Sequence, residues 1–244
     1  MKTLSFFLVL CCFSCVSNGQ DRLHPIDEYY NKHVADTVAS ISHGSVSNGS
    51  LEHGKLLPYH GINYSYFDTT SYFSGRAFLH EDVLALTLKA YKDLESVSDR
   101  FYRIMECSNK KGGKLWPHQT HQNGTSIDFM MPLTKDHKPY YKLDKIGVSH
   151  YWLSFDDAGK YSEDKSVEID FEAIAQHILL LNEAANEKGW KIKKVIIKIE
   201  LKDELYATPS GKKLKAKGIY VVQGLSKLVN ALHDEHYHID FTKV

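Results

Sequence analysis

Cysteine, excess charge and long hydrophobic runs are all scarce in this sequence. Of the four cysteines in its 244 residues, Cys11, Cys12 and Cys15 lie near the start, and only Cys107 follows them. A chain beginning after residue 19 therefore contains no cysteine pair for an internal disulfide. Lysine plus arginine and aspartate plus glutamate number 30 each, which gives no positive field for nucleic acid. No stretch approaches the ~20 apolar residues of a transmembrane segment.

The N-terminus has the pattern of a secretory signal. A basic residue, a short apolar run from Leu4 to Phe13 and a small-residue cleavage site ending at Gly19 follow one another. We expect residues 1–19 to be a signal peptide that directs export, which in a bacterium leads to the periplasm. A lipid anchor through Cys15 ranks second, because the residues before it fit a lipoprotein signal poorly.

Apolar periodicity outlines the fold. It predicts helices over Glu81–Ser96 and Asp170–Lys188. Strands are expected at Phe101–Cys107, at the β-branched segment Trp190–Leu201 and at His236–Phe241. Strands and helices mix without a βαβ rhythm, which predicts an α+β fold. We expect a single domain with a mainly antiparallel central sheet flanked by helices.

Histidine is abundant, with 14 residues, and two segments concentrate it. If residues 236–241 form a strand, alternate side chains face one side, so His236 and His238 point together. A catalytic zinc takes three nitrogen or oxygen ligands and leaves one position open for water. His121, Asp128 and His238 could supply these ligands, with His236 free beside the metal.

Spacing alone does not select this site. Histidine followed seven residues later by aspartate occurs four times, at 121/128, 137/144, 150/157 and 233/240. Short patterns of this kind often arise by chance. Nothing around the second and third pairs resembles a site, although His150 could approach the metal. The surrounding residues therefore have to distinguish the pairs.

Those residues resemble a known family. His-x-x-His-Gln-x-Gly-x-x-x-Asp begins at His118, and His-Asp-x-His-x-His begins at His233. Together they resemble the penicillin-insensitive murein endopeptidases, zinc peptidases related to lysostaphin-like peptidases, D-Ala-D-Ala peptidases and hedgehog domains. Similar segments upstream extend the likeness over most of the chain, to about residues 42–241. We therefore expect residues 20–41 to be a lead-in and residues 42–244 to be the peptidase domain.

The resemblance implies a role for each histidine of the motifs. It implies one zinc, with a second possible, and the following residues: His121, Asp128 and His238 as zinc ligands, His236 and His233 in proton transfer, and His118 at a second metal or the substrate. Glu235 rivals His236 as the base, although on a regular strand it points away from the metal. The family usually has an acid where this chain has Ser126, and its members can carry disulfides.

The implied activity is hydrolysis of peptide cross-links, D-alanyl to diamino acid, in peptidoglycan by metal-activated water. Peptidoglycan peptides are thus the expected partners, and no nucleotide motif is present. Two alternatives remain open: a D-Ala-D-Ala or L,D-type carboxypeptidase on wall peptides, and a non-catalytic zinc-containing wall-binding relative. Arg76 could bind a substrate carboxylate or form a surface ion pair.

Two further features have alternative interpretations. The tyrosine-rich segment 64–72 could line a substrate groove or pack within loops. Three Asn-x-Ser/Thr triplets carry meaning only in a host that glycosylates, and they begin at Asn48, Asn63 and Asn123.

Overall fold

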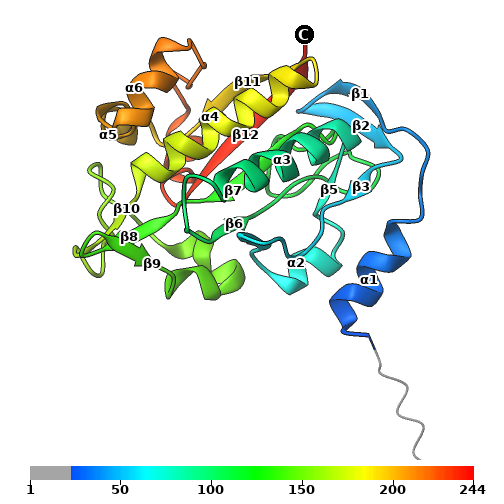
Figure 1. Ribbon diagram of the computed structural model, residues 1–244, viewed down its shortest axis with the longest axis horizontal. Helices are drawn as coiled ribbons and strands as arrows, with labels where there is room; N and C mark the ends of the chain where they lie inside the picture. Colours follow the sequence, from blue (N-terminus) through cyan, green and yellow to red (C-terminus); the bar gives the residue numbers. More distant parts are fainter. Residues whose placement is uncertain (1–22) are drawn as a thin grey trace, which may run out of the picture.

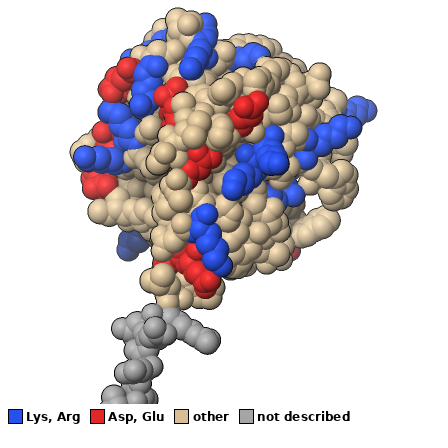
Figure 2. All heavy atoms as spheres, turned by 90° about the vertical axis from the view of Figure 1, so that its right-hand side faces the viewer, with Lys and Arg blue, Asp and Glu red and all other residues tan. Residues whose placement is uncertain are grey.

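The computed structural model describes residues 23–244 and has an α+β fold (Figure 1). The predicted signal peptide, residues 1–19, lies outside the described residues, as does the start of the predicted lead-in. Within residues 23–244, no helix is long and apolar enough to cross a membrane. Figure 2 shows basic and acidic side chains intermixed on one face of the molecule.

The helices are α1 (Pro25–His33), α2 (Thr69–Phe73), α3 (Glu81–Leu94), α4 (Phe171–Glu187), α5 (Lys202–Ala207), α6 (Pro209–Ala216) and α7 (Lys227–Ala231). Short 3-10 helices are η1 (Leu143–Lys145), η2 (Gly147–Trp152) and η3 (Ile199–Leu201). The strands are β1 (Ile41–Ser45), β2 (Asn48–Glu52), β3 (Lys55–Leu56), β4 (Tyr64–Tyr66), β5 (Phe78–Leu79), β6 (Tyr102–Ile104), β7 (Ser126–Met130), β8 (Leu133–Lys135), β9 (Lys138–Tyr140), β10 (Val167–Ile169), β11 (Trp190–Ile196) and β12 (His236–Lys243).

The central sheet has five strands in the order β11-β12-β7-β6-β4. The pairs formed by β11 with β12, β12 with β7 and β7 with β6 are antiparallel, and β4 lies parallel to β6. Smaller sheets join β1 to β2, β3 to β5, and β8 to both β9 and β10. The central sheet thus places the C-terminal strand β12 between β11 and the mid-chain strand β7.

Helices α3 and α4 lie side by side across one face of this sheet (Figure 1). Several apolar side chains of the two helices, including Leu86 and Ile178, are fully buried. Each such side chain contributes about 1.5–3 kcal/mol when it leaves water. The side chain of Asp170 accepts a hydrogen bond from the Ala173 amide and begins α4, and Gly189, with φ of 71°, follows its end.

The structure differs from the expected elements at three places, and at the first of these the strand predicted over Phe101–Cys107 is shortened to Tyr102–Ile104. The strand predicted over Trp190–Leu201 ends at Ile196, which pairs with His238 of β12, and the chain then turns into η3. The tyrosines of segment 64–72 do not line a groove. Tyr64, Tyr66 and Tyr72 are buried in the hydrophobic core, so the packing alternative is the one found.

Alternation along β12 separates the core from a polar cluster. Tyr237 lies on the helix side, where its hydroxyl hydrogen-bonds to Nδ1 of His177 on α4. Phe129 of β7 also contacts the His177 ring. The residues next to Tyr237 on β12 and next to Phe129 on β7 point to the opposite face of the sheet, because successive side chains of a strand alternate. That opposite face carries His236, His238 and Asp128.

Candidate metal centre

The centre forms where β7 and β12 pair. In this antiparallel register His238 lies directly opposite Asp128. The two side chains are buried, and Nδ1 of His238 is 2.7 Å from Oδ1 of Asp128. Residues that are 110 positions apart in the sequence are therefore brought together by sheet register.

His121 reaches the same point from the loop that precedes β7. Its backbone has a φ of 67°, a left-handed conformation that few non-glycine residues adopt. Gly124, with φ of 77°, completes the turn. A Cβ atom at Gly124 would lie 2.7 Å from Cδ2 of Leu51 and 2.8 Å from the His80 amide nitrogen. The loop is thus held tightly against β2 and the start of α3, and it presents the His121 ring inward.

Three donor atoms converge in this cluster. Nε2 of His121 lies 3.1 Å from Nδ1 of His238 and 3.2 Å from Oδ2 of Asp128. Donors bound tetrahedrally to zinc at 2.0–2.1 Å are ~3.3 Å apart, so these separations match the needs of a small cation. No hydrogen-bond donor among the described residues satisfies Asp128 Oδ2. A buried carboxylate oxygen facing ring nitrogens in this way fits a metal ligand.

His118 brings a fourth donor to the cluster. Its Nδ1 atom lies 3.5 Å from Oδ2 of Asp128. The ligand atoms of His118, His121 and Asp128 all lie within 4.8 Å of one another, so this largely buried group could hold a metal ion. Burial lowers the pKa of His118 to about 3, which keeps its ring neutral and available as a ligand.

Asp128 remains ionised in this position. Burial alone would raise its pKa, but the neighbouring histidine rings, His121 foremost, outweigh burial and hold the pKa well below its usual value. A negative charge therefore lies at the centre of the cluster, where a cation would compensate for it.

His236 lies beside the cluster and is oriented by Glu235. The Nε2 atom of His236 is 4.0 Å from Oδ2 of Asp128, and its Nδ1 atom hydrogen-bonds to Oε1 of Glu235. Burial opposes protonation of His236, but Glu235 and Asp128 outweigh it and raise the pKa to about 9. The carboxylate of Glu235 thus contacts the far side of the His236 ring and not the donor cluster.

His150 supports Glu235 from behind. Its Nε2 atom lies 3.1 Å from the backbone oxygen of Glu235 and 3.6 Å from the carboxylate Oε2. Its Nδ1 atom lies 3.3 Å from the Leu143 carbonyl oxygen. His150 therefore contacts Glu235, the residue that orients His236, and does not itself reach the donor cluster.

His233 lies next to His236 at the end of α7. The two ring centroids are 4.7 Å apart. Nδ1 of His233 lies 2.6 Å from the Val229 carbonyl oxygen, so it carries a proton that it donates there. Burial lowers the pKa of His233 to about 3, which leaves a neutral ring beside His236.

Sequence reasoning missed two contributors to this site, and it left the contact made by Ser126 unassigned. Asp240 contacts Nε2 of His238 at 2.6 Å, and Ser126 donates to the same carboxylate. The signal was available, since Asp240 follows His238 by two residues on one strand and must share its face. The second is Tyr151, whose ring lies 6.0 Å from that of His236 and 6.3 Å from that of His118. No sequence pattern pointed to Tyr151, because its position depends on the path of η2.

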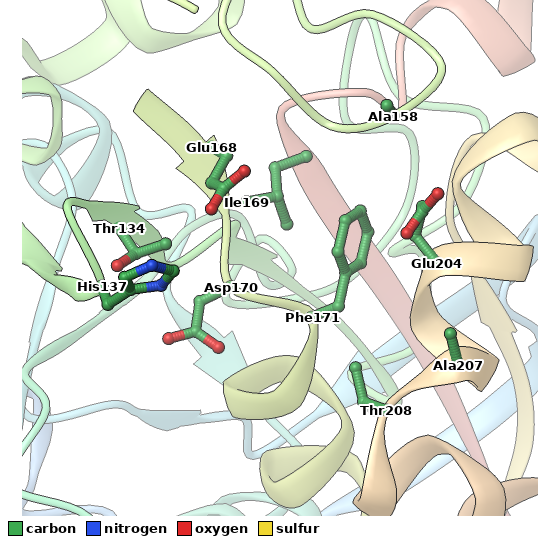
Figure 3. Close-up of a pocket in the computed structure, with 10 residues that line it drawn as sticks. All are labelled: Thr134, His137, Ala158, Glu168, Ile169, Asp170, Phe171, Glu204, Ala207 and Thr208. Atoms are coloured by element: carbon green, nitrogen blue, oxygen red, sulfur yellow. The ribbon is translucent and has the colours of Figure 1, made fainter. Parts of the chain in front are cut away.

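A separate hollow of about 480 Å³ lies near the start of α4 (Figure 3). Its lining includes Glu168, Asp170 and Glu204, with the Phe171 ring between Asp170 and Glu204. None of the residues predicted for the site lines it. Asp170 is engaged with Arg100 and with the first turn of α4. The convergent donors of the β7–β12 cluster therefore make a stronger candidate centre than this hollow.

Comparison with models of known families and with curated proteins gives no match for this chain. The geometry of the cluster and the order of its motifs are therefore the features that bear on function. Chemically, the arrangement offers nitrogen and carboxylate donors for one cation and a separate histidine that is held by a carboxylate.

Proposed function

We propose that this chain is an exported zinc metallopeptidase that hydrolyses peptide cross-links in peptidoglycan. The observation that carries the proposal is the buried convergence of His121, Asp128 and His238, with His236 beside them and oriented by Glu235. The family resemblance of the two histidine motifs supports the choice of zinc and of substrate. The signal-like N-terminus supports a periplasmic location.

His121, Asp128 and His238 would hold the zinc, and they would bind through Nε2, a carboxylate oxygen and Nδ1 respectively. When bound there, zinc lowers the pKa of a coordinated water to about 7 and polarises a carbonyl group. Binding requires the His238 ring to lose its Nδ1 proton, so metal uptake releases protons. His118 would approach the metal side of the site or the substrate.

His236 would transfer the proton. Because Glu235 holds Nδ1, the free Nε2 atom faces the cluster and can accept a proton from the attacking water. The same nitrogen then donates that proton to the leaving amine. Positive charge bound near Asp128 would oppose protonation of His236 and lower its pKa from about 9. Glu235 is therefore assigned an orienting role and His236 the role of base.

The contacts of the Arg76 guanidinium favour an internal cross-link over a free peptide end as the substrate. A carboxypeptidase needs a cationic group for the terminal carboxylate of its substrate. Nε of Arg76 donates to Glu106 at 2.6 Å, and Nη1 donates to the Trp116 carbonyl at 3.0 Å. The guanidinium is thus engaged by the protein, which supports cleavage between two linked peptides.

The test is digestion of purified cross-linked muropeptide dimers, with bound zinc quantified by elemental analysis. We expect the zinc-loaded protein to convert dimers to monomers and His121→Ala to lose both metal and cleavage. The matched control is His137→Ala, which removes an exposed histidine of the same His–Asp spacing and should leave both unchanged.

The remaining outcomes separate the alternatives. Release of D-alanine from monomer tails without cleavage of dimers would identify a carboxypeptidase. One zinc per chain with neither reaction would indicate a wall-binding relative. A protein that binds no zinc would contradict the proposal as a whole.

A further inference from the structure

A row of three polar side chains crosses the sheet beside the candidate metal centre. Asp240 on β12 lies opposite Ser126 on β7 and opposite Lys194 on β11. A register shift in β11 between Ile192 and Lys194 accompanies the placement of Lys194 in this row. The row therefore joins three adjacent strands at one level.

Asp240 is the centre of this row and is fully buried. Its Oδ1 atom accepts a hydrogen bond from the Ser126 hydroxyl at 2.6 Å. Its Oδ2 atom lies 3.2 Å from Nζ of Lys194. A buried carboxylate with a hydroxyl donor and an ammonium group is fixed in orientation and remains charged.

The fixed carboxylate is directed at His238. Oδ1 of Asp240 lies 2.6 Å from Nε2 of His238, while Nδ1 of the same ring faces Asp128 and His121. A ring that donates its Nε2 proton to Asp240 presents an unprotonated Nδ1 to the cluster when it is neutral. A carboxylate behind a ligating histidine sets both the tautomer and the orientation of the ring.

We propose that Asp240 is a positioning residue for metal binding, and that Ser126 and Lys194 hold it in place. The inference rests on the proposed function in that it takes the cluster to bind zinc. It also accounts for Ser126 at a position where the resembling family usually has an acid. In this chain the carboxylate is on the neighbouring strand, and Ser126 is its hydrogen-bond donor.

The experiment measures zinc affinity by competition with a chromophoric chelator for the full chain and two variants. Asp240→Asn keeps the shape of the side chain but removes its charge, and we expect zinc affinity to fall about 10–100-fold. Ser126→Ala removes only the hydroxyl that donates a hydrogen bond to Asp240, and it should weaken zinc binding several-fold. The control Asp144→Asn alters another buried carboxylate, outside the cluster, and should leave zinc affinity unchanged.

A spectroscopic readout separates positioning from folding. In long-range proton–nitrogen spectra of the zinc-loaded protein, His238 should be protonated at Nε2, and Ser126→Ala should speed exchange of that proton. Zinc affinities equal to the parent in both variants would overturn the role of Asp240 while leaving the zinc site intact. Absence of zinc binding by the parent itself would instead overturn the proposed function, so the two failures are distinct.

Discussion

The cluster between β7 and β12 and the loop region 136–157 contain the same residue types at the same spacing, but only the first brings them together. His121 and Asp128 are in contact and buried. In the loop region, His137 is exposed at the turn between β8 and β9, whereas Asp144 is buried in η1. Sequence spacing is therefore equal in two places that have very different chemistry.

In the second pair of the loop region the burial is reversed: the histidine is buried and the aspartate is exposed. His150 is buried against Glu235, and Asp157 is exposed and paired with Lys198 at 2.8 Å. The difference between the regions lies in what surrounds each pair. Asp128 is fixed on a strand that is paired on both sides, and a constrained loop returns His121 to it. Strand pairing, and not spacing, assembles the site.

The largest expected effect comes from exchanging His238 and Ile239 on β12. The double substitution His238→Ile and Ile239→His keeps composition but moves the imidazole to the core face of β12. We expect loss of metal binding and a fall of several kcal/mol in the free energy of unfolding, because an unpaired polar ring is buried. Chelator competition and urea unfolding measure the two effects.

The matching exchange in the loop region is His137→Lys with Lys138→His. Both positions are exposed, so stability should change by less than about 0.5 kcal/mol. An equal loss in both exchanges would show that strand alternation does not determine the site.

His236→Gln separates catalysis from metal binding within the cluster. Its Nε2 atom lies 4.0 Å from Asp128, and its side chain is not among the proposed ligands. We expect turnover of muropeptide dimers to fall about 10²–10⁴-fold, the usual contribution of a general base, while bound zinc stays near the parent value. Retained turnover would transfer the base role to Glu235 or His233.

Glycine substitutions sharpen the contrast between the constrained loop and an open turn. Gly124 and Gly113 both have positive φ values, of 77° and 75°. Gly113→Ala has open space and should cost only the left-handed strain of about 1–2 kcal/mol. Gly124→Ala also meets Leu51 and the backbone at His80, which adds about 1–3 kcal/mol. Urea unfolding of both variants measures the difference, and equal costs would refute the tight seating of the loop.

A pH-dependent prediction concerns His177, on the other face of β12. Burial lowers its pKa to about 3 in the folded protein, against about 6.5 in an unfolded chain. The unfolded chain therefore binds more protons between pH 6.5 and pH 3, and stability falls as pH decreases through that window. We expect His177→Phe to reduce this slope by up to about 1.4 kcal/mol per pH unit. Unchanged slopes in urea unfolding across the window would contradict the assignment.

Sequence patterns predicted the elements whose signals are local. The helices at 81–94 and 171–187 carry their own apolar stripe and end signals, and the α+β class follows from the mixture of elements. The shared face of His236 and His238 follows from strand alternation. What the sequence could not provide is register, because the pairing of Asp240 with Ser126 and Lys194 depends on two neighbouring strands.

The same limit applies to side chains that approach through loops. Glu235 precedes β12 by one residue, and strand alternation alone directs it away from the cluster. Its carboxylate nevertheless reaches Nδ1 of His236 and lies near His150, which arrives from η2. Such contacts are decided by the tertiary path of segments with no periodic signal.

Asn123 lies beneath the β1–β2 hairpin, and this placement has a practical consequence for producing the protein. Its carbonyl accepts a hydrogen bond from Ser42, and its side-chain oxygen accepts one from Thr125, the third residue of its glycosylation triplet. In a host that attaches glycans during synthesis, Asn123 is an acceptor site before the chain closes over it. The attached sugar could not fit beneath the hairpin, so the loop bearing His121 could not pack against β2 and the start of α3. Glycosylated material from a secretory eukaryotic host would then lack the His121 donor at the candidate metal centre, and Asn123→Gln would not be a neutral remedy because the Asn123 side chain accepts a hydrogen bond from Thr125.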